Sequence, residues 1–116
     1  MFELGEENRK ASIPEVYHIM NEIKDRYQYN NSNRAIVFRE TFEYVRELNQ
    51  IENSKDLENL KKLLKEEFYL KGDDISSLLS LFPSTVVEVR ALIPTLKYID
   101  DEIIKQFLNQ MKKIKK

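Results

Sequence analysis

The sequence predicts an all-α protein, and three observations carry that prediction. Apolar residues recur at three- and four-residue steps through most of the 116 positions. S/T-x-x-E capping patterns, which begin helices, stand at Ser12 and at Thr85. Hydrophobic residues make up 41% and charged residues 34%, a balance typical of helices with charged outer faces. We expect an N-terminal arm and partner-binding helices in residues 1–52 and a helical bundle in residues 53–116.

The first eleven residues lack helical periodicity and predict an arm. Phe2 and Leu4 alternate with polar neighbours, as in a short strand that ends at Gly5. Such a strand has nothing to pair with among the expected helices. It either frays or docks on another chain.

Ser12 begins the first predicted helix. Ser12 and Glu15 form a capping box, and Pro14 is tolerated in the first turn. An apolar stripe follows, and His18 lies away from it as a surface side chain. If the C-terminal helices close their own core, this stripe stays uncovered and binds a partner together with the strand. In the alternative, the stripe packs on the second helix. The candidate interface residues are Phe2, Leu4, Ile13, Val16, Met20 and Ile23.

Three further helices are expected in the middle of the chain. The second helix runs from about Arg34 to Glu52, and its apolar line holds Phe38, Phe42 and Val45. The third follows an N-cap at Asn53 or Ser54 and stops at Gly72. A short fourth helix, capped by Asp73 or Asp74, ends at Pro83. The expected buried residues of the third and fourth helices are Leu57, Leu60, Leu64, Phe68, Ile75, Leu78 and Leu79.

Residues 85–89 read TVVEV, which suits either a strand or a helix. The capping box of Thr85 with Glu88 favours a helix, and Pro94 forbids its continuation. We expect Val89, Leu92 and Ile93 to meet the stripes of the neighbouring helices. Asp100 then caps a last helix that ends near Lys113, with an inward stripe of Ile104, Phe107, Leu108 and Met111.

Composition argues against several classes of function. With 19 basic and 20 acidic residues the net charge is −1, which implies no general attraction to nucleic acid or to anionic membranes. There is no cysteine and one histidine, so thiolate and histidine-based metal sites or catalytic triads are implausible. The two glycines form no phosphate-binding loop, and no apolar run is long enough to span a bilayer. We expect no enzymatic activity, cofactor or membrane association.

The C-terminal signals follow a distinctive order. From Leu78 the chain reads L-x-x-L-F-P-S-T-x-x-E-x-x-A-L-I-P-T-L, and D-D-E-I-I-K-Q-F-L follows from Asp100. This order resembles the fourth-subunit family of eukaryotic RNA polymerase II, which has a counterpart in the stalk of the archaeal polymerase. The upstream match, including Leu4 to Glu6, is looser. The residues that carry the resemblance are Pro83, Thr85, Glu88, Leu92, Ile93, Pro94, Thr95, Leu96, Asp100 and Asp101.

The resemblance implies a C-terminal fold like the HRDC domain and a role without catalysis. It implies a nuclear stalk subunit that forms a heterodimer with a larger subunit carrying an oligonucleotide-binding (OB) barrel. The heterodimer would dock on the polymerase core near the RNA exit path and act in transcription initiation, with weak or indirect RNA contact. The equivalent stalk subunit of RNA polymerase III remains an alternative. A stand-alone HRDC-like nucleic-acid-binding module is a second alternative, which the net charge of −1 disfavours.

Overall fold

The computed structural model describes residues 3–4, 9–29 and 31–116, and for residues 3–4 and 9–10 it describes the backbone only. Within these residues the chain is helical apart from two short strands, which confirms the all-α fold class. The six α-helices are α1 (Ile13–Ile23), α2 (Asn33–Leu48), α3 (Ser54–Glu66), α4 (Gly72–Leu81), α5 (Val86–Leu92) and α6 (Asp101–Ile114). Two 3-10 turns, η1 (Lys24–Arg26) and η2 (Pro94–Leu96), follow α1 and α5.

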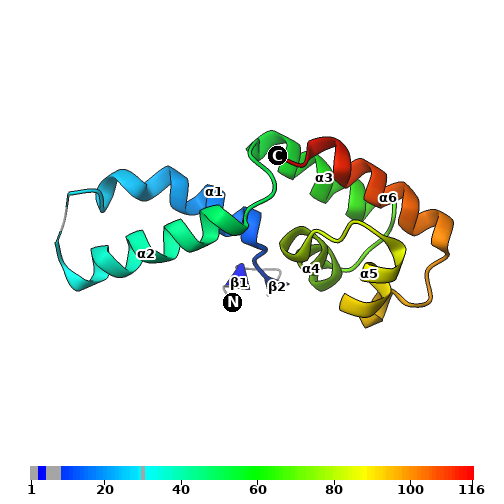
Figure 1. The fold of residues 1–116 in the computed structure, drawn as a ribbon. Coiled ribbons are helices and arrows are strands. Elements are labelled where there is room, and N and C mark those ends of the chain that lie inside the picture. Colours follow the sequence, from blue (N-terminus) through cyan, green and yellow to red (C-terminus); the bar gives the residue numbers. More distant parts are fainter. Residues whose placement is uncertain (1–2, 5–8, 30) are drawn as a thin grey trace.

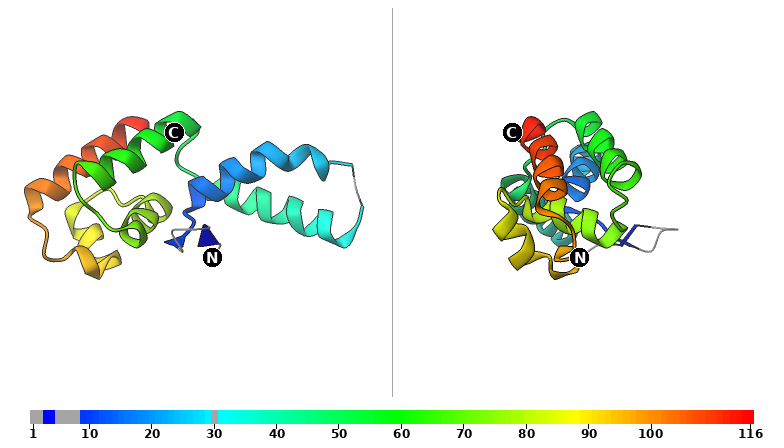
Figure 2. Two further views of the ribbon diagram at one scale, coloured as in Figure 1. Left: turned by 180° about the vertical axis from the view of Figure 1, so that it is seen from behind. Right: turned by 90° about the vertical axis from the view of Figure 1, so that its right-hand side faces the viewer.

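The molecule is elongated, with extents of 51 × 28 × 25 Å. Helices α1 and α2 form a hairpin at one end, and α3 to α6 form a bundle at the other (Figure 1). The view from behind shows the same separation (Figure 2, left). The C-terminus returns to the junction between the two parts, where the Lys116 amide donates to the Gln50 carbonyl at 2.8 Å.

The N-terminal arm forms a β-hairpin. Strand β1 (Glu3–Leu4) pairs antiparallel with β2 (Arg9–Lys10), with Glu3 opposite Lys10 and Leu4 opposite Arg9. The expectation that this strand has no partner in the chain is therefore wrong, because it pairs with the segment just before α1. Strand β2 also contacts α4 of the bundle. Phe2 lies outside the described residues.

Helix α1 begins with the expected capping box. The Glu15 amide donates to Ser12 Oγ at 3.4 Å, and the Ser12 amide donates to Glu15 Oε1 at 3.2 Å. The apolar stripe of α1 is not uncovered, because α1 packs against α2. Val16 and Met20 are buried there with Ala11 and Val45. The alternative in which the first helix packs on the second is the one observed.

Helix α2 ends at Leu48, four residues before the expected end at Glu52. Asn49 leaves the helical conformation, and its buried side chain bonds to the backbone two residues on. Its Nδ2 donates to the Ile51 carbonyl at 2.8 Å, and its Oδ1 accepts from the Ile51 amide at 3.1 Å. This local ring of hydrogen bonds competes with the helix and turns the chain toward the bundle. Ile51 consequently lies in the core of the bundle.

Helix α3 ends by a different device from the one expected. Tyr69 adopts the left-handed conformation (φ 56°), and the Leu70 amide returns to the Leu64 carbonyl at 3.1 Å. This bond spans six residues and closes the C-terminus of α3 around a left-handed residue, a position that is normally a glycine. Gly72 is not the stop; it is the first residue of α4, with Asp73 and Asp74 in the first turn rather than at the cap.

The bundle packs the expected stripes of α3, α4 and α6 around one core. Buried positions include Leu57, Leu60 and Leu64 of α3, and Phe107 of α6 meets Phe68 edge-on with 5.7 Å between ring centroids. The remaining core residues are Ile51, Leu70, Ile75, Leu78, Leu79, Val89, Ile93, Leu96, Ile104, Leu108 and Met111. The TVVEV segment is helical, as the capping box predicts. Leu92 is 49% exposed, so its expected burial in this core is wrong.

Candidate interaction sites

An apolar groove lies between α1 and α2. It encloses about 450 Å³ and is lined by residues of both helices and of the turn after α1. Three predicted interface residues, Val16, Met20 and Ile23, line it. Ile19 and Val37 also line the groove and are 48% and 60% exposed. These two side chains offer more accessible apolar surface than the predicted stripe. Because the stripe faces α2, the apolar residues beside it are the ones left exposed in the groove.

Ile13, another predicted interface residue, instead contributes to the junction with the bundle. It is half-buried, and its amide donates to Ser80 Oγ of α4 at 3.0 Å. Beside it, the buried Glu15 carboxylate accepts a hydrogen bond from Ser12 Oγ at 2.8 Å and pairs with Lys61 Nζ of α3 at 2.9 Å. The capping glutamate therefore has a second role that local sequence does not reveal.

His18 also belongs to the junction and is not a free surface side chain. It is half-buried, and its Nε2 lies 3.0 Å from the Ile51 carbonyl oxygen. A hydrogen bond at that distance requires a proton on Nε2. The Tyr17 ring meets the imidazole edge-on with 5.0 Å between ring centroids. The helical wheel places His18 off the apolar stripe correctly but gives no information about the segment that follows α2.

The signature residues around α5 are mainly architectural. Phe82 closes α4 in the left-handed conformation (φ 47°), and Pro83 behind it is buried. Thr85 caps α5 by accepting from the Glu88 amide at 3.2 Å. Ile93 is buried at the end of the helix, and Pro94 begins η2. Asp100 occupies the N-cap position of α6 but makes no side-chain cap, so the expected capping by its carboxylate is wrong.

Arg90 is the residue that sequence reasoning missed in this region. Its guanidinium donates to the Lys97 carbonyl at 2.6 Å, to the Ile99 carbonyl at 2.8 Å and to the Asp101 carboxylate. These bonds fix the link between η2 and α6. The hydrogen bond from Arg90, assisted by its positive charge, holds the pKa of Asp101 below its ordinary value. A second link joins Thr95 Oγ1 to the Asp74 carboxylate of α4.

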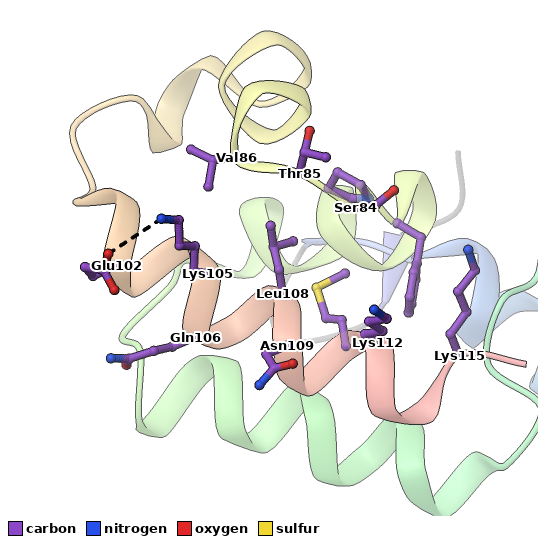
Figure 3. Close-up of a pocket in the computed structure, with 13 residues that line it drawn as sticks. Ser84, Thr85, Val86, Glu102, Lys105, Gln106, Leu108, Asn109, Lys112 and Lys115 are labelled. Atoms are coloured by element: carbon purple, nitrogen blue, oxygen red, sulfur yellow. Dashed lines mark ion pairs between the residues drawn. The ribbon is translucent and has the colours of Figure 1, made fainter.

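A second groove lies between the α4–α5 corner and α6, and it encloses about 740 Å³. Ser84, Thr85 and Val86 form one wall, and the exposed side chains of α6 form the other (Figure 3). Leu108 points between the two walls (Figure 3). Lysines 105, 112 and 115 lie along the α6 wall.

In the described part of the chain, no three His, Asp or Glu side chains are placed to hold a metal ion. No single described helix is long and apolar enough to cross a membrane; α4 and α5 pass that test only as a pair, which bends by 120°. What these surfaces offer is apolar and charged area for contact with other molecules.

Comparison with known proteins agrees with the C-terminal signature. A family model described as RNA polymerase Rpb4 matches residues 7–115. The chain is also similar to "DNA-directed RNA polymerase II subunit rpb4" of Dictyostelium discoideum, with 27% identity over 89 residues. That alignment covers 76% of this chain and 57% of the relative, so the chain spans little more than half of the relative's length. Since the family model covers nearly every residue from the arm to the end of α6, the chain belongs to the RNA polymerase Rpb4 family.

Proposed function

We propose that this chain is a non-catalytic subunit of DNA-directed RNA polymerase II and forms a stalk with a larger subunit that carries an OB barrel. The assignment to polymerase II is supported by the Dictyostelium relative, which is named as a subunit of DNA-directed RNA polymerase II. The same assignment places the chain in the nucleus and gives it a role in transcription initiation. The heterodimer docks on the polymerase core and positions factors near the RNA exit.

The observation that carries the proposal is the apolar surface of the α1–α2 hairpin. The groove between the helices exposes Ile19 and Val37 on a part of the molecule with few buried residues of its own. Contiguous exposed apolar area of this kind is typical of a protein interface. The proposed contact with the larger subunit covers this groove and includes the β1–β2 hairpin beside it.

The mechanism is one of positioning. The Glu15–Lys61 ion pair and the His18 and Ile13 hydrogen bonds fasten α1 to the bundle. A partner that binds the α1–α2 hairpin is therefore held in a defined orientation relative to α3–α6. The chain contributes shape to the stalk, and the larger subunit supplies most of the contact with RNA.

The charge balance supports a weak or indirect role in RNA binding. A net charge of −1 gives little counterion release when the chain meets a phosphate backbone. We expect weak binding of single-stranded RNA by the chain alone, through lysines 112, 113, 115 and 116 if at all. Submicromolar binding at physiological salt would instead support the stand-alone nucleic-acid module.

Affinity purification of the tagged chain tests the assignment directly. Stoichiometric recovery of the larger stalk subunit with the largest subunit of polymerase II is the expected result. Recovery of the polymerase III core instead would transfer the chain to that enzyme. Recovery of neither would contradict the proposal.

The interface is tested by co-expression with the co-purifying larger subunit. Ile19→Glu with Val37→Glu places two carboxylates in the α1–α2 groove and should abolish the complex. Val87→Glu is the matched control, because Val87 is 77% exposed on α5 and lies outside that groove. A complex that survives the double variant at unchanged affinity would place the interface elsewhere.

A further inference from the structure

We propose that the groove between the α4–α5 corner and α6 binds a short acidic peptide segment with apolar side chains, supplied by another protein. The groove is defined by Phe82, Pro83 and Val86 on one wall and by Lys105, Lys112 and Lys115 on the other. It lies on the bundle and shares no lining residue with the groove between α1 and α2, and the inference does not depend on the proposed heterodimer.

The charge of this groove differs from that of the chain as a whole. Its lining includes three lysines and a single acid, Glu102, although the chain has a net charge of −1. A groove between α3 and the start of α4 is balanced, because its lining contains lysines 61, 62 and 65 together with Glu58, Glu66 and Asp73. The groove along α6 therefore concentrates positive charge in a way that its neighbour does not, and it would attract an acidic ligand.

The lysines of the groove are also available for a ligand. Lys105 pairs only loosely with Glu102, with 3.6 Å between Nζ and Oε1. Within the described residues, the side chains of Lys112 and Lys115 form no ion pair or hydrogen bond. By contrast, Lys61 and Lys116 each have an acidic partner. An acidic segment would supply the missing partners without breaking an internal contact of Lys112 or Lys115.

The apolar part of the lining favours a peptide over a nucleic acid. Leu108 lies between the two walls and forms the floor, and the partly buried Phe82 and Val86 flank it. Single-stranded nucleic acid is typically held by exposed aromatic rings on which bases stack, together with a basic channel. This groove has one partly buried ring and a carboxylate in its basic wall. Apolar side chains of a peptide fit the floor while its carboxylates meet the lysines.

The spacing of the lysines defines the probe. Lys105 and Lys112 are two turns apart on α6, or about 10 Å. A peptide in the polyproline II conformation advances about 3.1 Å per residue with three residues per turn, so acids three residues apart lie on one face about 9 Å apart and roughly match that distance. We therefore choose a fluorescein-labelled nine-residue peptide with aspartates at every third position and leucine or alanine between them. Matched probes replace each aspartate by asparagine or replace the peptide by oligouridine.

The experiment is a fluorescence anisotropy titration of the full chain. We expect saturable binding of the acidic peptide that weakens with added salt, and binding of the asparagine peptide at least about tenfold weaker. Lys112→Glu with Lys115→Glu should weaken the acidic peptide by at least about tenfold. The control Lys55→Glu with Lys62→Glu makes the same charge change on exposed positions of α3 and should leave affinity within about twofold.

A third variant tests the apolar wall. Val86→Asp places a carboxylate at the first residue of α5, where it suits the helix dipole, and should abolish binding by repelling the peptide. Thermal unfolding of each variant separates loss of the groove from loss of the fold. Equal loss in the α3 control, equal affinity for the asparagine peptide, or tighter binding of oligouridine would each overturn the proposal.

Discussion

The α1–α2 hairpin and the α3–α6 bundle use their apolar residues differently. Among the described residues, the bundle buries fifteen apolar side chains in one cluster, whereas the hairpin buries four in its own. The hairpin relies instead on a row of stacked aromatic rings along its length. Ring centroids lie 4.3 Å apart for Tyr27 and Phe38, 6.2 Å for Phe38 and Phe42, and 5.7 Å for Phe42 and Tyr17.

From this difference we expect that the bundle can fold alone and that the hairpin cannot. Two helices with a four-residue core bury too little apolar area to offset the entropy of ordering their chain. The hairpin therefore depends on its fastening to the bundle and, in the proposed complex, on a partner over its exposed groove. An apolar residue is either buried in the core of its own chain or exposed for contact with a partner. The bundle uses its apolar residues mainly for its core, whereas the hairpin leaves part of them exposed.

Separating the two regions should give the largest effect. A fragment of residues 50–116 should retain its helical circular dichroism and unfold cooperatively in urea. A fragment of residues 1–49 should show little helix, because isolated helices of this length are marginal in water. Cooperative unfolding of the N-terminal fragment by itself would contradict the comparison and would show that the hairpin closes its own core.

Truncating one aromatic ring in each region compares the two cores directly. Phe107 is fully buried in the bundle, so Phe107→Ala should lower the free energy of unfolding by about 3–5 kcal/mol. Phe42 is only partly buried in the hairpin, so Phe42→Ala should have a smaller effect. Urea unfolding of the full chain measures both. Equal losses would mean that the aromatic row stabilises the hairpin as strongly as the bundle core stabilises α6.

The contact between the regions is tested by Lys61→Met. This change leaves the buried Glu15 carboxylate without its partner in α3 and should destabilise the protein by about 1–3 kcal/mol. Lys62→Met is the control, because Lys62 is exposed, and its effect should stay within about 0.5 kcal/mol. Hydrogen exchange should then increase in α1 more than in α3–α6. Uniform change across the chain would indicate that the ion pair does not couple the two regions.

Within α5, buried and exposed apolar side chains can be compared at two positions, Val89 and Leu92. Val89 is fully buried, and Val89→Ala should cost about 2 kcal/mol. Leu92 is exposed, so Leu92→Ala should change stability by less than about 0.5 kcal/mol despite its place in the family signature. A large loss for Leu92→Ala in the isolated chain would show that its side chain is packed after all.

Features that depend on a few adjacent residues could be predicted from the sequence. The capping boxes at Ser12 and Thr85 form as expected, because their donors and acceptors are three residues apart. The long stripes of α3 and α6 were also predicted correctly. In the seven-residue α5 the pattern is too short to fix the buried direction: Ile93 lies 40° from Val89 on the wheel and Leu92 lies 60° to the other side.

Features that depend on distant residues could not be predicted. Nothing near Arg90 in the sequence indicates that it bonds to carbonyls seven and nine positions later. The same holds for His18, whose partner Ile51 is 33 positions away, and for Lys61 with Glu15. The left-handed Tyr69 replaced an expected glycine stop because a tertiary fold can impose a conformation that local preference opposes. The two grooves form where segments distant in the sequence pack together. The apolar stripe of α1 alone therefore predicted only part of the candidate interface.

The smallest expected effect concerns the pH dependence of the link between α5 and α6. Because the folded pKa of Asp101 is lowered, mainly by its hydrogen bond from Arg90, the carboxylate stabilises the fold above its unfolded pKa. That contribution is lost as the pH falls through the folded pKa. Asp101→Asn should therefore reduce stability at pH 7 and leave it nearly equal to the unsubstituted chain in strong acid. Asp101 is exposed, so the difference is small and calls for paired urea titrations. In an Arg90→Gln background most of the pH-dependent difference should disappear, because Lys105 makes only the smaller remaining contribution; an undiminished difference would mean that Arg90 does not set the pKa of Asp101.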